Sequence, residues 1–383
     1  MIVAHCIHGL GLGGAQQVIR HLVAGRSSAV RHVVYTPEDG LFRAPIEAAG
    51  ASVRVIPRRW AKLDPSWAFA LSRAMRADRV GLVHTHLFGD SLHGVCAARL
   101  AGGVPVLVTL HNGAAAHSRL QRLGYRWLLG RAAARIACTE SARRSFLGLA
   151  DGIETIANGI DPHPGDATAP AARAAARRAL GVGAHTPLIG ALGRCVAQKD
   201  FATLLDALAR CQPQGGALPE LVLLGDGPLR AGLEAQARRL GIRTRVHFAG
   251  LRDDARALLP AFDVVAISSR FEGLSMALLE AMAAARCLVA TRAAGVTDAL
   301  GDDQALLVPV GDAPALAAGI DRALADAPLR TRLGAAAQAR FRERFTAARM
   351  VAEYERRYRQ LAARPPRLAA GVTAGAAAHR QQD

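Results

Sequence analysis

Short apolar runs rich in valine, leucine, isoleucine and alanine recur along the whole chain, and helix-like stretches separate them. This alternation constrains the fold most, because strands that alternate with helices form parallel sheets with helices on both faces. We therefore predict an α/β fold of doubly wound, parallel sheets. The strands predicted for the first half span residues 2–7, 31–35, 52–56, 80–85, 104–110, 135–138 and 154–156.

A proline-rich stretch at residues 161–170 interrupts the alternation and reads as a linker. A chain of 383 residues is also too long for one ordinary core. We predict two similar domains, at residues 1–161 and 171–345, and expect the alanine- and glycine-rich tail at 366–383 to be disordered. The strands predicted for the second half span residues 188–192, 220–224, 245–248, 264–268, 287–290 and 305–308.

The chain is strongly basic, with 48 basic and 31 acidic residues and a net charge of +17. Nearly all basic residues are arginine, with lysine only at Lys62 and Lys199, which indicates mainly a compositional bias. The excess also fits an anionic partner such as a nucleotide, a lipid headgroup or a nucleic acid. Six cysteines without a CxxC pair fit free thiols in a reducing compartment. With no signal peptide or transmembrane run expected, we predict a cytoplasmic protein.

The run from Glu272 to Glu280 holds two carboxylates, with only small or apolar residues between them. It lies between a strand-like and a helix-like segment. The free N–H groups of a helix's first turn can receive an anion there. Carboxylates accept hydrogen bonds from hydroxyl groups. A nucleotide sugar contains both a phosphate and a polyol, so we predict a nucleotide-sugar site in this run.

The first loop matches GxGxxG from Gly9 to Gly14, directly after a strand. A dinucleotide site also needs an acidic residue at the end of the second strand, where this chain has Tyr35 and Thr36. The pattern therefore disfavours a nicotinamide or flavin cofactor. It leaves open a loop that lets another ligand approach the backbone, or a purely structural turn.

Two further loops follow strands of the second half. Arg194 and Lys199 lie in the first of them, where parallel sheets bind ligands, and both suit a diphosphate. They could equally be solvated surface cations. In the second loop, Gly225 and Gly227 provide a tight backbone, and Asp226 could either cap the next helix or contact a ligand.

Nine of the thirteen histidines precede residue 118. His84, His86 and His111 fall at predicted strand ends. The spacing of His84 and His86 suggests a metal pair, but no carboxylate or cysteine has a convincing spacing to them. We therefore expect no metal, and a single His111 that lines the site.

The segment 119–135 alternates arginines with Leu120, Leu123, Trp127 and Leu128 at helical spacing. With the basic, aromatic stretch 58–62, it could form a surface that contacts an anionic membrane. A solvated helix packed on its own domain is the alternative.

These motifs, in this order, resemble the retaining family 4 glycosyltransferases of the GT-B fold. The resemblance extends from Gly9 to about Tyr358, and the E-x7-E run is its strongest element. The matching segments are residues 13–16, 109–112, 158–161, 193–199, 225–229 and 272–280.

The resemblance implies two Rossmann-like domains facing a cleft, with residues 347–362 as a helix that crosses back to the first domain. Arg194 and Lys199 would neutralise the leaving diphosphate. Glu280 would bind the ribose, Glu272 the transferred sugar, and His111 would lie beside that sugar. The other implied donor-binding residues are Gly13, Gly14, Gly225, Asp226, Gly227, Gly273, Leu274, Ser275 and Met276.

The implied function is retaining transfer of a sugar from a UDP- or GDP-sugar to a hydroxyl of a glycan or lipid-linked acceptor in bacterial cell-envelope or polysaccharide biosynthesis. No cofactor, metal or nucleic acid partner is implied. Two departures stand out: Gln16 replaces the family's usual acidic residue, and Thr297 and Asp298 replace its usual Pro-Glu. An epimerase, hydrolase or phosphorylase on the same fold, or a nonenzymatic nucleotide-sugar or anionic-polymer binder, are the alternatives.

Overall fold

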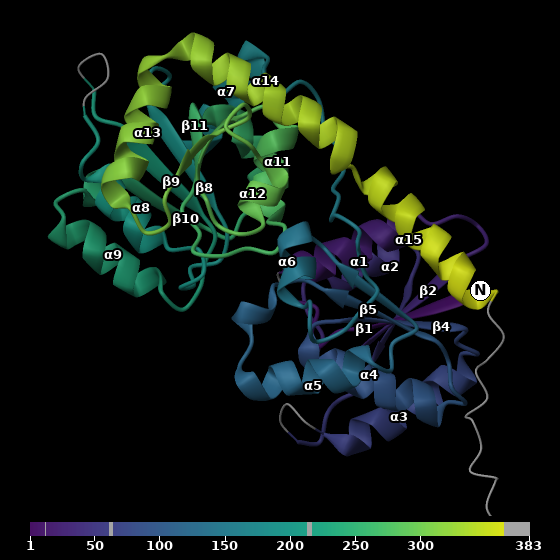
Figure 1. Ribbon diagram of the computed structural model, residues 1–383. Helices are drawn as coiled ribbons and strands as arrows, with labels where there is room; N and C mark the ends of the chain where they lie inside the picture. The colour runs from purple at the N-terminus through teal and green to yellow at the C-terminus, as the bar shows by residue number, and fades with distance from the viewer. Residues whose placement is uncertain (12, 61–63, 213–216, 364–383) are drawn as a thin grey trace, which may run out of the picture.

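The computed structural model describes residues 1–11, 13–60, 64–212 and 217–363, and it contains two parallel sheets (Figure 1). The strand order is β3-β2-β1-β4-β5-β6-β7 in the first sheet and β10-β9-β8-β11-β12-β13 in the second. All pairs of neighbouring strands run parallel. The predicted fold class is therefore confirmed. The tail predicted at 366–383 lies outside the described residues.

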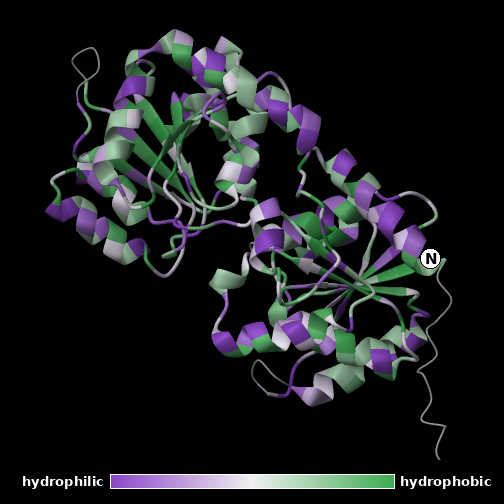
Figure 2. Cartoon of the chain, viewed as in Figure 1, coloured by the Kyte–Doolittle hydropathy of each residue, from purple (hydrophilic) through white to green (hydrophobic). Residues whose placement is uncertain are grey.

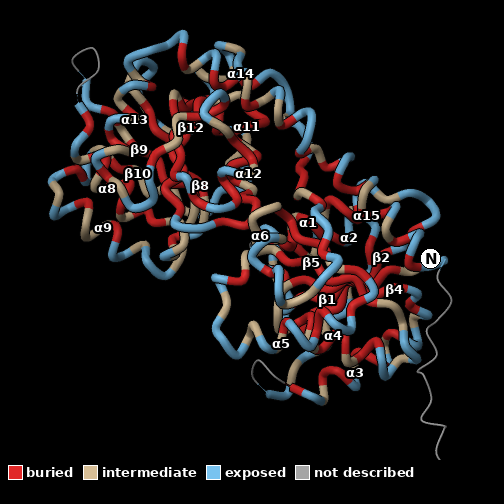
Figure 3. The backbone as a smooth tube through the Cα atoms, viewed as in Figure 1, coloured by how far each residue is buried: buried red, intermediate tan, exposed pale blue. Residues whose placement is uncertain are grey.

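The predicted strands are all present, and their ends agree with the structure to within two residues. Their residues are mostly apolar and buried, at the centre of each sheet (Figures 2 and 3). The strands of the first sheet are β1 (Ile2–Cys6), β2 (Arg31–Thr36), β3 (Ser52–Val55), β4 (Leu82–His86), β5 (Val106–Leu110), β6 (Ala134–Ala137) and β7 (Ile153–Thr155). Those of the second are β8 (Leu188–Leu192), β9 (Glu220–Leu224), β10 (Val246–Gly250), β11 (Val264–Ile267), β12 (Cys287–Thr291) and β13 (Leu306–Val308).

Helices connect the strands, and several begin at a side chain that caps their first turn, such as Thr139, Asp312 and Asp326. No helix in the described ranges is both long and apolar enough to cross a bilayer. The helices before the second sheet are α1 (Gly14–Ala24), α2 (Arg43–Ala48), α3 (Pro65–Ala77), α4 (Phe88–Leu100), α5 (Arg119–Leu129), α6 (Glu140–Ser145) and α7 (Pro170–Leu180). The later ones are α8 (Phe201–Leu208), α9 (Arg230–Arg239), α10 (Ala255–Leu258), α11 (Met276–Ala283), α12 (Val296–Ala299), α13 (Ala313–Ala325), α14 (Ala327–Arg344) and α15 (Ala347–Ala362).

The last helix, α15, has the predicted bounds and leaves the second sheet to pack on the first (Figure 1). Its residues Met350, Tyr354 and Tyr358 share a buried apolar cluster with Val3 and Val18. A backbone bridge between Ile160 and Thr346 holds the two crossing segments together at the start of this helix. The C-terminal helix is thereby part of the core of the first sheet.

Both sheets reverse their strand order beside the first strand of the set, at β1/β4 and at β8/β11. Connections leave in opposite directions at such a point, and the loops leave a crevice at the carboxyl ends of the strands. The predicted site residues follow β1, β5, β8, β9 and β11. The topology therefore places their loops at the ligand-binding edges of the two sheets.

Candidate active site

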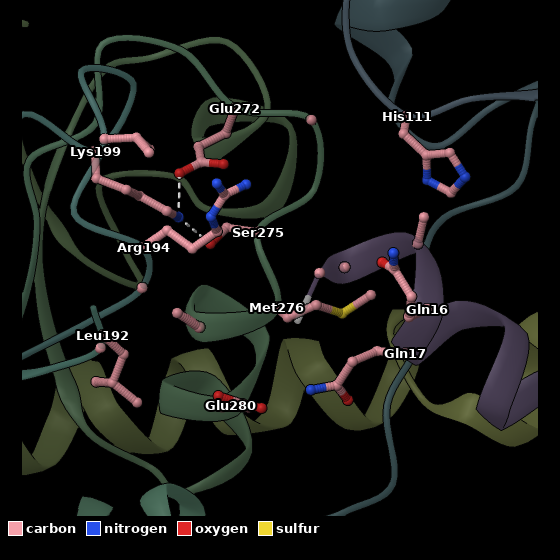
Figure 4. A pocket seen from close by; sticks show the side chains of 18 of the residues that line it. Gln16, Gln17, His111, Leu192, Arg194, Lys199, Glu272, Ser275, Met276 and Glu280 are labelled. Atoms are coloured by element: carbon pink, nitrogen blue, oxygen red, sulfur yellow. Dashed lines mark hydrogen bonds and ion pairs between the residues drawn. The ribbon is translucent and has the colours of Figure 1, made fainter. Parts of the chain in front are cut away.

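A cavity of about 510 Å³ lies where these loops meet, between the carboxyl ends of the two sheets (Figure 4). The N-termini of α1 and α11 face each other across it, because a side chain at Gly14 would contact Met276 at 3.6 Å. Most of the predicted site residues line this cavity, so the structure brings them together as one site. They are Gly13, Gly14, His111, Arg194, Lys199, Gly225, Glu272, Gly273, Leu274, Ser275, Met276 and Glu280.

Asp226 and Gly227 do not line the cavity, and the structure gives them a role in the turn after β9. Asp226 accepts a hydrogen bond from the Gly227 N–H at 2.7 Å and pairs with Arg230 at 3.0 Å. Gly225, at φ +146°, approaches so closely that a Cβ there would lie 1.9 Å from the Gly193 carbonyl oxygen. This turn therefore shapes the cavity wall through its backbone, whereas the Asp226 side chain faces its own helix.

Glu272 is buried and forms an ion pair with Lys199, with 2.5 Å between Lys199 Nζ and Glu272 Oε1 (Figure 4). Ser269 donates to the same oxygen at 2.7 Å, and Gln198 donates to Oε2 at 3.1 Å. A buried carboxylate needs such partners, because burying an unpaired charge is strongly unfavourable. The arrangement fixes the orientation of the Glu272 carboxylate at the cavity wall.

The positive end of the site lies at the start of α11. Ser275 precedes this helix, and its Oγ lies 3.2 Å from Lys199 Nζ. Arg194 is exposed, and its guanidinium makes no hydrogen bond or ion pair with any residue in the described ranges. The first N–H groups of α11 are unsatisfied within the helix and carry partial positive charge. One uncompensated cation, one paired cation and a helix N-terminus thus face the same space.

Glu280 projects from α11 into the base of the cavity, where it is partly buried (Figure 4). Burial raises the pKa of Glu280 to about 7, against weaker opposing effects of Arg256 and Lys199. A carboxyl group in this position gains from any ligand hydroxyl that donates to its ionised form. Glu280 is therefore suited to hold a polyol at the end of the cavity away from His111.

His111 follows β5 and reaches the cavity from the first sheet (Figure 4). Its backbone contacts the E-x7-E loop so closely that a Cβ at Gly273 would lie 1.9 Å from the His111 carbonyl oxygen. Burial lowers the pKa of His111 to about 4, so its ring is neutral at physiological pH. Glycine at position 273 therefore lets the two halves of the site meet.

Behind His111, the described residues include one cluster with metal-ligand spacing, formed by His5, His84 and His86. Each ring nitrogen of these three residues already has a hydrogen-bond partner, including Thr109 and Tyr358 for His84. The cluster contains no carboxylate or thiolate. The geometry is that of a hydrogen-bonded core.

Several other residues contribute to the site without a recognisable signal in the sequence. Gln198 orients Glu272, and its role follows only from the fold of the loop after β8. Asn158 lies within a segment matched to the family, yet its contact with the Leu274 carbonyl at 3.4 Å was not foreseen. Asp298 stands at a position where the sequence departs from the family. It accepts hydrogen bonds from the Ser141 N–H and hydroxyl. These bonds join the two lobes, which are the first and the second sheet, each with its helices.

Comparisons with known proteins agree with this architecture. The family model described as Glycosyltransferase Family 4 matches residues 12–164, and the one described as Glycosyl transferases group 1 matches residues 186–326. The chain is 31% identical to a 2-deoxystreptamine glucosyltransferase of Streptomyces kanamyceticus over 81% of its own length and 89% of that protein. It is 41% identical to the lipopolysaccharide core biosynthesis glycosyltransferase LpsE of Rhizobium meliloti (strain 1021), over 41% of this chain and 45% of that one.

Among solved structures, the fold is similar to that of Anabaena Alr3699/HepE in complex with UDP-glucose. The TM-score is 0.83 at 23% sequence identity, and the superposition covers 94% of this chain and 100% of that one. The likeness therefore extends over nearly the whole chain at the level of the fold.

Proposed function

Because the chain belongs to the group 1 glycosyltransferases of the GT-B fold, we propose that it transfers a sugar from a nucleotide-sugar donor to a hydroxyl of a glycan or lipid-linked acceptor. The observation that carries this proposal is the cavity itself. An uncompensated Arg194 and the N-terminus of α11 face the same space as Glu272 and Glu280. Anion-binding and hydroxyl-binding groups are thus combined as a nucleotide sugar requires.

The proposed roles of the cavity residues follow from the charges that they carry. Breaking the bond between a sugar and a diphosphate leaves a negative leaving group, which positive groups aimed at the departing oxygens stabilise. Arg194, Lys199 and the N–H groups of α11 supply these charges without a metal. Gly13 and Gly14 approach the same space from α1. Closure of the two lobes would exclude water and thereby favour transfer over hydrolysis.

Glu280 accepts hydrogen bonds from the ribose, and Glu272 with His111 holds the transferred sugar. Every oxygen of Glu272 is engaged by Lys199, Ser269 or Gln198, which makes it a positioned acceptor rather than a free nucleophile. We therefore propose that the acceptor attacks from the face that the diphosphate leaves, with retention of configuration. Proton NMR of the first product formed gives the anomeric configuration, and an inverted product overturns this step.

The donor is proposed to be a UDP- or GDP-sugar, with UDP-glucose as the first to test, because the structurally similar HepE was solved with it. Bacterial polysaccharide or lipopolysaccharide biosynthesis is the proposed pathway, since LpsE acts in core biosynthesis by its name. A thermal-shift screen against UDP-, GDP- and ADP-sugars, with and without magnesium, tests donor class and metal independence together.

The decisive experiment follows donor consumption by the purified protein. Release of the nucleotide diphosphate, accelerated by a glycan or lipid-linked acceptor, supports transfer. Stabilisation by a nucleotide sugar without its consumption indicates a binding protein, and conversion of the donor with no acceptor indicates an epimerase or hydrolase. A requirement for inorganic phosphate indicates a phosphorylase.

A cytoplasmic protein with peripheral contact to an anionic membrane is the remaining part of the proposal. On α5, Leu120 and Leu123 are 78% and 64% exposed, and Trp127 is 38% exposed. Arginines at positions 119, 122 and 126 flank these apolar side chains on the same helix, whereas Leu128 is buried. Apolar side chains rimmed by arginine fit the interface of an anionic bilayer.

Co-sedimentation with vesicles tests this surface. The protein is expected to bind vesicles that contain phosphatidylglycerol at low salt, and the Leu120→Gln/Leu123→Gln variant is expected to bind them much less. Leu218→Gln, which changes an exposed leucine of the other lobe, serves as the matched control. Equal binding by all three proteins, or by none, contradicts the membrane assignment.

A further inference from the structure

A row of buried histidines crosses one face of the first sheet and ends at the cavity. His32 lies on β2, His5 on β1 and His86 on β4, and His111 directly follows β5. The strand order β2-β1-β4-β5 makes these four strands neighbours. Since alternate side chains of a strand point to the same face, the imidazole rings lie side by side beneath α1 and α15.

Hydrogen bonds join the four rings into an unbranched chain. His111 Nε2 lies 3.0 Å from His86 Nδ1, and His86 Nε2 lies 3.1 Å from His5 Nδ1. His5 Nε2 in turn lies 2.9 Å from His32 Nδ1. Burial keeps the rings neutral, because it lowers the pKa of His5 and His86 well below the usual value and that of His32 and His111 to about 4.

A neutral imidazole has one N–H donor and one acceptor nitrogen. Each of the three links needs one proton, so all four rings must donate in the same direction. Only two arrangements satisfy every link. In one, His111 offers an N–H at Nδ1 to the cavity, and in the other it offers a lone pair there.

The far end of the chain distinguishes the two arrangements. His32 Nε2 is buried and has no hydrogen-bond partner among the described residues. If each ring donated toward His32, the His32 Nε2 atom would carry an N–H without a partner. If each ring donated toward His111, the same atom would be an acceptor without a partner. Among buried backbone groups, N–H donors without a partner are rarer than under-satisfied carbonyl acceptors, and we apply the same preference to this ring nitrogen. Donation from His32 toward His111 is therefore the favoured direction.

We propose that His32, His5 and His86 lock His111 in its Nδ1–H tautomer, so that His111 meets the cavity as a neutral hydrogen-bond donor. The three buried histidines are then positioning residues that act through His111. In the proposed glycosyltransferase, on which this ligand assignment rests, His111 would donate to a hydroxyl oxygen of the sugar or acceptor. It would not be the base that takes the acceptor's proton, because its lone pair faces His86.

The tautomer can be measured directly in the ligand-free protein. Two-bond proton–nitrogen correlation spectra of protein labelled with ¹⁵N-histidine separate Nδ1–H from Nε2–H rings, and loss of one signal in His111→Asn assigns His111. We expect the Nδ1–H form at pH 7.5. A His111 ring in the Nε2–H form overturns the proposal. Because no ligand is present, this result does not depend on whether the proposed donor is correct.

Two variants test whether the chain sets the tautomer. His86→Phe removes the donor to His111 Nε2, and His111 is expected to become a mixture of both tautomers. His84→Phe is the matched control, because His84 is equally buried beside His86 but bonds Tyr358 and Thr109 instead. This variant should keep the Nδ1–H signal of His111 even if it lowers stability.

Retention of a pure Nδ1–H signal in His86→Phe would mean that the chain does not control His111, and the proposal would fail. Loss of the signal in both variants would make the effect one of packing and would equally overturn it. Should His86→Phe not fold, His86→Leu takes its place, and the wild-type spectrum alone still decides the tautomer. Donor affinity, measured alongside, is expected to fall in His86→Phe and not in His84→Phe.

Discussion

The two sheets have similar topology but opposite ways of handling polar groups. The first sheet buries His32, His5 and His86 in its core, in a hydrogen-bonded row that ends at the half-buried His111. The central strands β8 and β11 of the second sheet contain only apolar residues and glycine. Its charged groups, including Arg194 and Lys199, lie in the loops at the edge of the sheet.

This difference assigns different chemistry to the two walls of the cavity. Charges in loops can be solvated in the open cavity and can meet the charge of a ligand, as a diphosphate requires. A hydrogen-bonded core of neutral rings presents a fixed donor without a charge, which suits a sugar hydroxyl. In the proposed function, the second lobe thus binds the anion and the first lobe orients the neutral groups.

The largest expected consequence is acid sensitivity of the first lobe alone. The native state keeps His32 and His111 neutral down to about pH 4, whereas the unfolded chain protonates near pH 6.5. The unfolded state therefore binds more protons in this window, and stability falls as pH falls through it. Each of these histidines should lower the free energy of unfolding by about 3 kcal/mol when the pH reaches 4.

Tryptophan fluorescence measures this transition selectively, because all three tryptophans, Trp60, Trp67 and Trp127, precede the second sheet. We expect a fluorescence transition between pH 6.5 and 4, while amide exchange in the second sheet remains slow. Protonation of Glu280, whose pKa is raised to about 7, favours the folded state in part of the same window and protects the second lobe. Simultaneous unfolding of both lobes would remove the distinction between the sheets.

The next largest effect concerns Arg194, whose guanidinium lines the cavity without a hydrogen-bond or ion-pair partner among the described residues. Arg194→Ala should lower kcat by about a hundredfold to a thousandfold, because one positive contact to the leaving group is lost in a water-poor site. Steady-state release of the nucleotide diphosphate gives the rate. The control is Arg292→Ala, which removes the same charge from an exposed pair with Asp302 in the same lobe. It should change the rate by no more than about threefold.

Similar rates for the two variants would mean that net charge, and not the position of Arg194, drives the reaction. Retained activity in both would contradict the assignment of the loop after β8. Circular dichroism of each variant separates loss of activity from loss of fold.

The strand positions could be read from the sequence because buried parallel strands are continuous apolar runs, and the loops after them carry the polar residues. That logic located Arg194, Lys199, Glu272 and Glu280 on one side of a cavity. It could not show that Lys199 pairs with Glu272, because this contact depends on how two loops fold toward each other. The histidine chain was visible only as a surplus of histidines, since its hydrogen bonds depend on the order of four strands.

A smaller effect is expected from the ionisation of Glu280. In its proposed role, Glu280 accepts hydrogen bonds from two hydroxyl groups best as a carboxylate, yet burial raises its pKa to about 7. The affinity for a nucleotide sugar should therefore fall below pH 7, by up to about tenfold per pH unit. Isothermal titration with the intact nucleotide sugar is suitable, because its diphosphate diester does not titrate in this range.

Glu280→Gln should bind the donor more weakly and with no pH dependence between pH 6 and 8. His111 stays neutral throughout this range, so any remaining pH dependence in the variant would place the titrating group elsewhere in the site.

The smallest effect is expected for Asp226, where the resemblance to the family and the structure disagree. The resemblance places Asp226 at the donor, but its side chain bonds Gly227 and Arg230 outside the cavity. Asp226→Ala should therefore change the KM for the donor by no more than about twofold, as expected for an exposed pair. Gly225→Ala, by contrast, should abolish the site, since its Cβ would overlap the Gly193 carbonyl. A tenfold rise in KM for Asp226→Ala would show that this side chain turns toward the donor when the lobes close. The wall that the second lobe contributes to the cavity would then include the Asp226 side chain in the turn after β9.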